Sequence, residues 1–188
     1  PPRQLQAEQM LWAALKADTS TSLVTLCPAV ILGPCLTKAH TKSSTVLVRE
    51  AIFHNPMNAY YTSFVDVRDV ASACRMALMK PDAGGQRFIV VGDEPPMLTT
   101  ELATYAAQEL PQYSFVGVGK YSEWLIWMLA RVGVVSSFQE AMSTRKLPFS
   151  NSKLKAVLGV SPRSLGSSVK DTAVSMIEGG WVKPKQMG

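Results

Sequence analysis

The tail of the chain reads SKLKAVLG from Ser152 to Gly159 and PRSL from Pro162 to Leu165. An apolar periodic run predicts that a helix follows, and Gly179-Gly180 ends it. A second signature, FVDVRDVA, runs from Phe64 to Ala71, and a third, PAVILGP, runs from Pro28 to Pro34. The order and spacing of these segments decide the fold prediction.

Strand and helix patterns alternate along the first 110 residues. Short apolar runs predict strands at Leu23–Cys27, Tyr60–Val65 and Arg87–Val91, while helical spacing predicts helices at Arg3–Ala17, Thr41–Phe53, Arg68–Lys80 and a segment capped by Thr99 or Thr100. Ser43 or Ser44 is a possible cap of the second helix. The prolines and Gly33 predict an irregular loop over Pro28–Pro34. Such alternation is typical of a parallel α/β sheet.

The expected helix at Arg68–Lys80 carries an apolar stripe. Ala73, Cys74 and Leu78 belong to it, so we expect Cys74 to be a small core residue. Asp66 and Asp69 lie at the helix start, where carboxylates accept hydrogen bonds from free N–H groups. A paired general acid/base is the less favoured alternative for these two carboxylates.

Composition excludes several classes. The chain has 188 residues, 47% of them hydrophobic, which is enough for a core and argues against wholesale disorder. The formal net charge of +5 comes from scattered Lys and Arg, so nucleic-acid binding has little support, whereas an anionic small molecule and a well-solvated surface both remain open. Three cysteines without a CxxC pair indicate neither a disulfide framework nor a zinc site and favour a reducing, cytoplasmic setting. No signal peptide opens the chain, and no apolar stretch is long enough to span a membrane.

Taken together, the three segments resemble the C-terminal half of an extended short-chain dehydrogenase/reductase, a member of the NAD-dependent epimerase/dehydratase superfamily. The dihydroflavonol reductase and cinnamoyl-CoA reductase branch is the most similar, and a nucleotide-sugar epimerase ranks lower because of the PRSL tail. The resemblance implies an α/β fold: the C-terminal part of a doubly wound, Rossmann-like parallel sheet plus a small substrate-binding lobe.

The same resemblance implies how the domain is organised. Residues 1–188 form the C-terminal half of one domain, with 1–110 mainly sheet strands and helices and 111–188 mainly the substrate lobe and terminal helices. Trp124, Trp127 and Met128 recur on one helical face, which favours a core role; the resemblance adds that this segment helps to wall the substrate cleft.

The resemblance also implies a cofactor site for NADP or NAD. Its members would be a loop beside the nicotinamide and one hydroxyl that reaches a cofactor phosphate: Pro28, Ala29, Val30, Ile31 and Ser43. Without the resemblance, Pro and Gly in this loop simply turn the chain out of the sheet. We expect no metal site.

The catalytic residues of the family are not found in this chain. Ala7-Glu8 resembles the continuation beyond the catalytic Lys, which puts Gln4 at the Lys position and the Tyr before Pro1. Two readings stay open: the parent protein has lost its catalytic Lys, or the alignment slips at a truncated N-terminus. Gln carries no charge that could lower the pKa of a Tyr. No glycine-rich phosphate loop occurs either. We therefore assign no catalytic residue and expect this fragment to be inactive alone.

Two functions follow from these observations. The first is part of an NAD(P)H-dependent oxidoreductase that acts on a carbonyl or alcohol of a small organic substrate. The second is a catalytically inert, dehydrogenase-like nucleotide-binding regulator or scaffold subunit. The expected partners are a small-molecule substrate and a missing N-terminal half or partner chain, with no nucleic acid and no membrane span.

Overall fold

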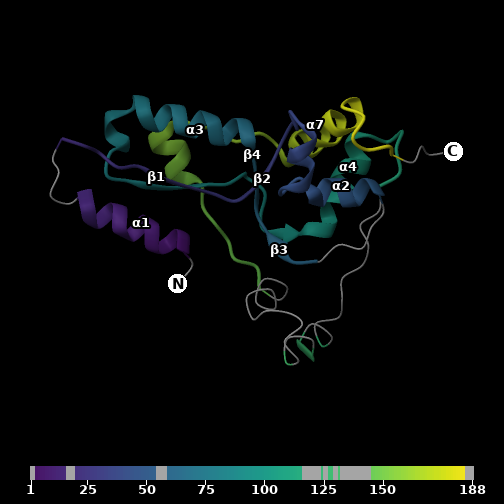
Figure 1. Cartoon of the computed structure of the whole chain (residues 1–188), viewed down its shortest axis with the longest axis horizontal. Coiled ribbons are helices and arrows are strands. Elements are labelled where there is room, and N and C mark those ends of the chain that lie inside the picture. The colour runs from purple at the N-terminus through teal and green to yellow at the C-terminus, as the bar shows by residue number, and fades with distance from the viewer. Residues whose placement is uncertain are drawn as a thin grey trace.

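The structure is a computed structural model, and it describes residues 3–15, 20–53, 59–115 and 145–184, together with 124, 127, 128 and 131. Its helices and strands alternate as predicted over the first 110 residues (Figure 1). The expected pieces at 115–118 and 121–132 lie almost entirely outside the described residues.

The first sheet joins the two expected buried strands. β1 (Thr25–Pro28) pairs in parallel with β5 (Arg87–Val90), with Leu26 opposite Phe88. Helix α3 (Val67–Met79) and the wide helical turn Leu154–Leu158 cover one face of this sheet, and α1 (Arg3–Ala14) lies on the other side (Figure 1). The parallel pairing confirms the predicted α/β fold class.

The Pro28–Pro34 segment is not simply a loop, so that prediction is wrong in its middle. Val30–Leu32 forms strand β2, which pairs in parallel with β4 (Phe64–Asp66). Branched apolar side chains suit a strand, and Pro28 and Gly33 only bound it. Gly33 has φ +131°, and a Cβ there would lie 2.6 Å from Val67 Cγ1, so glycine is required.

The predicted strand at Tyr60–Val65 is divided in two. β3 (Tyr61–Thr62) pairs in antiparallel fashion with β6 (Met97–Leu98), whereas β4 pairs with β2. The chain changes partners at Ser63, which is buried.

Among the described residues, two large hydrophobic clusters form most of the core, and a small third one contains Ala51 and Ala103. The larger of the two, which we call the α7 cluster, packs α2 (Val46–Phe53), α4 (Leu102–Glu109) and α7 (Leu165–Glu178) around Leu102, Val169 and Met176. The smaller of the two, the β1 cluster, packs α3 and the Leu154–Leu158 turn against the first sheet around Phe88. The tail motif therefore contributes to both clusters.

The start of α3 joins these clusters through charged side chains. Asp66 caps the helix as predicted, because its carboxylate accepts a hydrogen bond from the N–H of Arg68 at 2.8 Å. Asp69 does not cap; its carboxylate accepts from the N–H of Arg163 at 2.8 Å and forms an ion pair with that side chain. The FVDVRDVA and PRSL motifs are thus partners in the fold.

Several apolar side chains expected in the core are exposed. Cys74 is exposed and Leu78 is 90% exposed, so the prediction of a core Cys74 is wrong. On α1, Leu11 is 54% exposed. Trp124 and Trp127 are also exposed, at 66% and 47%, and Arg131 lies 4.8 Å over the Trp127 ring. The described residues do not cover these side chains.

Candidate functional site

The carboxyl ends of β1 and β5 separate, and β4 enters between them. β1 follows β5 up to Pro28, and the N–H of Ala29 still donates to the carbonyl of Val90 at 3.0 Å. The next N–H, that of Val30, donates instead to the carbonyl of Ser63, which immediately precedes β4, at 3.1 Å. On its far side β4 accepts from Gly92, which follows β5, at 2.7 Å. Ligands of open α/β sheets bind at such carboxyl-end divergences.

The predicted nicotinamide neighbours lie at this divergence. Pro28 ends β1, while Val30 and Ile31 lie in β2. The N–H groups of Ala29 and Val30 are engaged by the sheets, and Pro28 has none. In a parallel register the N–H of Ile31 points away from β4. Ile31 is therefore the member of this group whose N–H is turned away from the described sheet.

Ser44, not Ser43, reaches the divergence directly. The Ser44 hydroxyl donates to the carbonyl of Ile31 at 2.5 Å. Ser43 is exposed, and its hydroxyl donates to the carbonyl of His40 at 2.8 Å. Both hydroxyls donate to carbonyl oxygens and do not cap α2. The sequence offered Ser44 only as a cap, so its link to Ile31 was missed.

Hydroxyl groups of α7 hold the loop that follows β2. The N–H of Gly33 donates to Thr172 Oγ1 at 2.8 Å, and the N–H of Cys35 donates to Ser175 Oγ at 2.8 Å. Thr172 is fully buried, and its hydroxyl lies 2.6 Å from the carbonyl of Ser168. Sequence reasoning treated α7 as an apolar stripe; the recurrence of Ser168, Thr172 and Ser175 on one face was the signal it missed.

The Asp66 carboxylate is buried, and its contacts stabilise the fold. Burial alone raises the pKa of Asp66, but hydrogen bonds from Arg68 and Ser168 outweigh it and hold that pKa below its usual value. Arg68 also pairs with Asp171 of α7 at 2.7 Å. Because Asp66 and Asp69 bind different arginines, the arrangement favours anchoring of α7 over a general acid/base pair.

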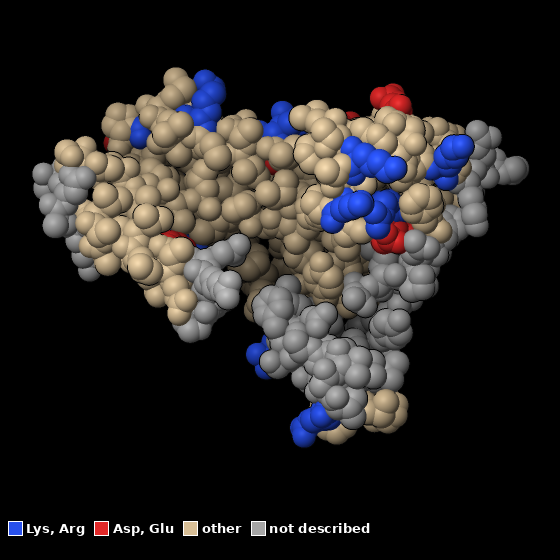
Figure 2. All heavy atoms as spheres, in the orientation of Figure 1, with Lys and Arg blue, Asp and Glu red and all other residues tan. Residues whose placement is uncertain are grey.

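The surface around the divergence is partly visible in Figure 2. The surface is hollowed beneath β2, between α1 and the part of the molecule that carries β3, and Lys and Arg side chains gather over the end that holds α2 and α7. Within the described ranges, no three His, Cys, Asp or Glu side chains approach closely enough to hold a metal ion. The side chain of Gln4 lies outside the described residues.

The amino-acid sequence was compared with those of known proteins and protein families. No family model matches the chain. Two uncharacterised oxidoreductases of Saccharomyces cerevisiae are 26% and 25% identical to it over 184 and 182 residues. Each match covers 92% of this chain but only 48% of the relative. The chain therefore spans about half the length of the curated relatives it matches.

Solved structures that resemble this chain are also matched over about half of their own length. The yeast methylglyoxal/isovaleraldehyde reductase Gre2, solved with NADPH, matches 94% of this chain and 50% of its own at a TM-score of 0.68 and 23% identity. Gre2 of Candida albicans with NADPH matches with a TM-score of 0.67 at 20% identity, covering 92% of this chain and 49% of its own. The UDP-glucose 4-epimerase of Thermotoga maritima with UDP-glucose covers 93% and 52%, with a TM-score of 0.64 at 15% identity.

These matches show the Rossmann-like α/β fold that the sequence predicts, in a chain similar to reductases and to an epimerase. The predicted resemblance to the extended short-chain dehydrogenase/reductases is confirmed, and coverage of about half of each relative is consistent with a C-terminal half. In the part of the chain that the structure describes, no helix is long and apolar enough to cross a membrane.

Proposed function

We propose that the chain supplies the C-terminal half of an NAD(P)H-dependent oxidoreductase acting on a carbonyl or alcohol of a small organic molecule. The observation that carries the proposal is the placement of Pro28–Ile31 where the strands of the two sheets diverge. The oxidoreductase relatives and the NADPH-bound Gre2 structures support it. NADP is the preferred cofactor because both Gre2 structures contain NADPH.

The residues at the divergence fit a nicotinamide ring and its carboxamide. Apolar side chains of Pro28, Ala29 and Val30 offer packing surface, and the outward N–H of Ile31 offers a donor. The exposed Ser43 hydroxyl would turn from the carbonyl of His40 to donate a hydrogen bond to a cofactor phosphate. A nicotinamide cofactor bound there supplies the hydride for carbonyl reduction.

We propose that the rest of the site is supplied by residues outside this chain. The chain has no glycine-rich phosphate loop and no assigned catalytic residue, and Gln4 stands at the Lys position of the family pattern. We therefore expect residues 1–188 alone not to turn over substrate. The substrate lobe, which the resemblance puts mainly within residues 111–188, would wall the substrate. We also propose a cytoplasmic location, because all three cysteines are free and free cysteines are typical of a reducing compartment.

A second function is favoured by one residue. Gln4 supplies no positive charge, so a Tyr placed beside it would keep a high pKa and transfer protons poorly at neutral pH. A protein built this way would bind a dinucleotide as a regulator or serve as a scaffold subunit without catalysis.

One experiment separates the two functions. NADPH fluorescence is titrated, and reduction of methylglyoxal and isovaleraldehyde is followed, on this chain joined to the half it lacks. Binding with turnover supports the reductase, binding without turnover supports the regulator, and the absence of both contradicts a nucleotide role. Gln4→Lys should raise turnover if the reductase is correct, because the ammonium lowers the pKa of the Tyr.

A further inference from the structure

One edge of β1 is open. The N–H of Thr25 donates to the carbonyl of Gln86 at 3.0 Å, so the N–H and C=O groups of Thr25 and Cys27 point toward β5. Alternation along a strand then directs those of Val24 and Leu26 to the opposite edge. No described strand pairs with that edge. Pro28, which has no N–H, ends it.

The outer edge of β5 differs because side chains close it. The carbonyl of Arg87 accepts from Lys153 Nζ at 3.1 Å. The carbonyls of Val91 and Gly92, just beyond the strand, accept from Asn151 Nδ2 at 3.1 and 3.2 Å. A lysine and a polar cap are how natural proteins protect a sheet edge that no further strand joins.

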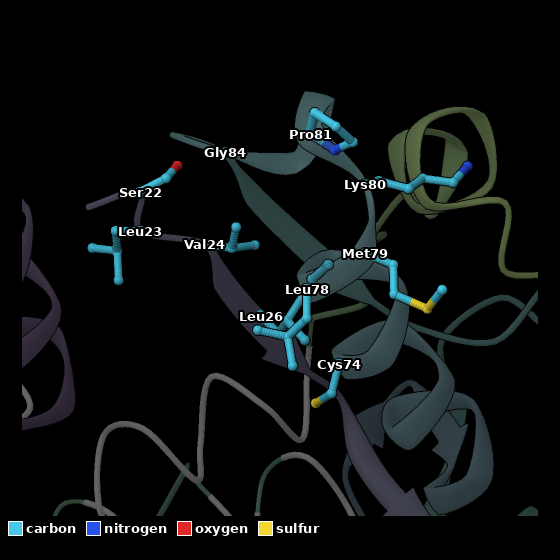
Figure 3. Close-up of a pocket in the computed structure, with 11 residues that line it drawn as sticks. Ser22, Leu23, Val24, Leu26, Cys74, Leu78, Met79, Lys80, Pro81 and Gly84 are labelled. Carbon is cyan, nitrogen blue, oxygen red and sulfur yellow. The ribbon is translucent and has the colours of Figure 1, made fainter. Parts of the chain in front are cut away.

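The open edge of β1 borders an apolar hollow. Its volume is about 610 Å³, and Leu26 of β1 and Cys74 and Leu78 of α3 line it (Figure 3). Leu78 and Met79 are 90% and 63% exposed. The one lining cation, Lys80, turns its amine away and donates to the carbonyl of Val157 at 2.8 Å. The hollow lies along β1 and toward its amino end, whereas the candidate cofactor site lies at its carboxyl end.

We propose that this edge and hollow form the seat of the other half of the reductase domain: an apolar strand that pairs with Val24 and Leu26, and a packed element that covers Cys74 and Leu78. The matches cover 92–94% of this chain but only 48–50% of the yeast relatives, so the remaining half of those proteins must meet this one across a surface. An unprotected strand edge beside an apolar hollow is the chemistry that strand addition requires. The inference rests on the fold and deepens the proposed function by naming the surface for the absent half.

The test uses the half of yeast Gre2 that this chain does not match, expressed with residues 1–188. We expect a 1:1 complex by light scattering. We also expect Cys74, read by peptide-resolved alkylation, to react at least about tenfold more slowly in the complex than in the chain alone, because access governs thiol reactivity. Leu78→Asp should abolish the complex, because a carboxylate cannot be buried in an apolar contact without a partner.

The matched control is Leu36→Asp. Leu36 is 80% exposed and lies outside the hollow, so this variant should form the complex as the parent does. Absence of a complex, a complex in which Cys74 stays reactive, or a homodimer that Leu78→Asp disrupts would each overturn the proposal; the homodimer would mean that a second copy occupies the seat. None of these readouts involves NADPH, so failure here is distinct from failure of the proposed cofactor site.

Discussion

The two large hydrophobic clusters, the α7 cluster and the β1 cluster, differ in how completely they are covered. Among the described residues, the three helices of the α7 cluster have one large exposed apolar side chain, Phe53 at the end of α2, which is 42% exposed. The helices on either side of the β1–β5 sheet have six: Leu5, Met10 and Leu11 of α1, and Val67, Leu78 and Met79 of α3. This chain therefore covers the α7 cluster almost completely. It covers the β1 cluster much less, because on the α3 side only the Leu154–Leu158 turn packs over it.

This difference shows which apolar side chains stabilise the molecule by themselves. A buried apolar side chain gains roughly 1.5–3 kcal/mol from its removal from water, and an exposed one gains almost nothing. The α7 cluster therefore contributes to stability in this chain as it stands. The side chains of α1 and of the outer face of α3 contribute only when something covers them.

The largest expected effect comes from a matched pair of leucines. Leu165 is 3% exposed in the α7 cluster, and Leu78 is 90% exposed on α3. Leu165→Ala should lower the free energy of unfolding by about 2–5 kcal/mol, because it leaves a cavity. Leu78→Ala should change that free energy by less than about 0.5 kcal/mol. Urea denaturation of the two variants measures both values, and equal losses would contradict the comparison.

The next effect concerns the charged link between the clusters. Asp66→Asn should lower the free energy of unfolding by about 1–3 kcal/mol at neutral pH, because it weakens hydrogen bonds from Arg68 and Ser168 to a buried carboxylate. The control is Glu109→Gln, which removes a looser and more exposed ion pair with Lys170 at 3.7 Å. Its loss should stay below about 1 kcal/mol, since exposed pairs contribute little. Urea midpoints that fall equally in both variants would contradict a special role for the buried carboxylate.

The Asp66→Asn variant also changes how stability depends on pH. The folded pKa of Asp66 is lowered from an unfolded value of about 3.9, so its contribution is fully present above that value and is lost as the pH falls through the folded pKa. Denaturation midpoints between pH 6 and pH 2 should therefore fall less steeply for Asp66→Asn than for the parent. Parallel curves would show that Asp66 is not the titrating anchor.

A smaller effect is expected where α7 holds the loop after β2. Thr172→Val removes the acceptor for the buried N–H of Gly33 and should lower the free energy of unfolding by about 1–2 kcal/mol, whereas Thr172→Ser keeps the hydroxyl. Hydrogen exchange at the Gly33 amide should accelerate in the valine variant alone. Unchanged exchange would mean that the loop is held by other contacts.

The smallest effect on stability is expected at Ser43. Its exposed hydroxyl donates only to the nearby carbonyl of His40, so Ser43→Ala should leave the urea midpoint almost unchanged. In the completed domain, loss of one hydrogen bond to a phosphate should weaken NADPH binding by roughly three- to tenfold, measured by fluorescence titration. Unchanged affinity would remove Ser43 from the proposed site.

The sequence predicted the elements better than their surroundings. Helical spacing located α3 to within a residue at each end, and the position of Asp66 predicted its capping role. The partner switch at Ala29–Val30 could not be read, because it depends on β4 entering between strands that lie far apart along the chain. Cys74 and Leu78 have the spacing of a buried stripe, but spacing does not show whether anything lies opposite.

Prediction of the candidate site from the sequence was limited for the same reason, because it too depends on contacts between distant residues. The Pro28–Ile31 segment was proposed from the family resemblance, whereas Ser44, Thr172 and Ser175 act through bonds to backbone groups of distant residues. Nearly every residue has a backbone carbonyl and N–H, so the sequence does not show which of them a hydroxyl will bind. Only its placement on a helix face hints at the role.

The contacts between α7 and the Gly33–Cys35 loop also bear on synthesis. Gly33 and Thr172 are 139 positions apart, and Cys35 and Ser175 are 140 apart. At translation rates of about 5–20 residues per second, the loop emerges from the ribosome on the order of ten seconds before the hydroxyls that fasten it. A premature stop codon ahead of Thr172 would therefore leave a nascent product whose Gly33–Cys35 loop never forms its hydrogen bonds to α7.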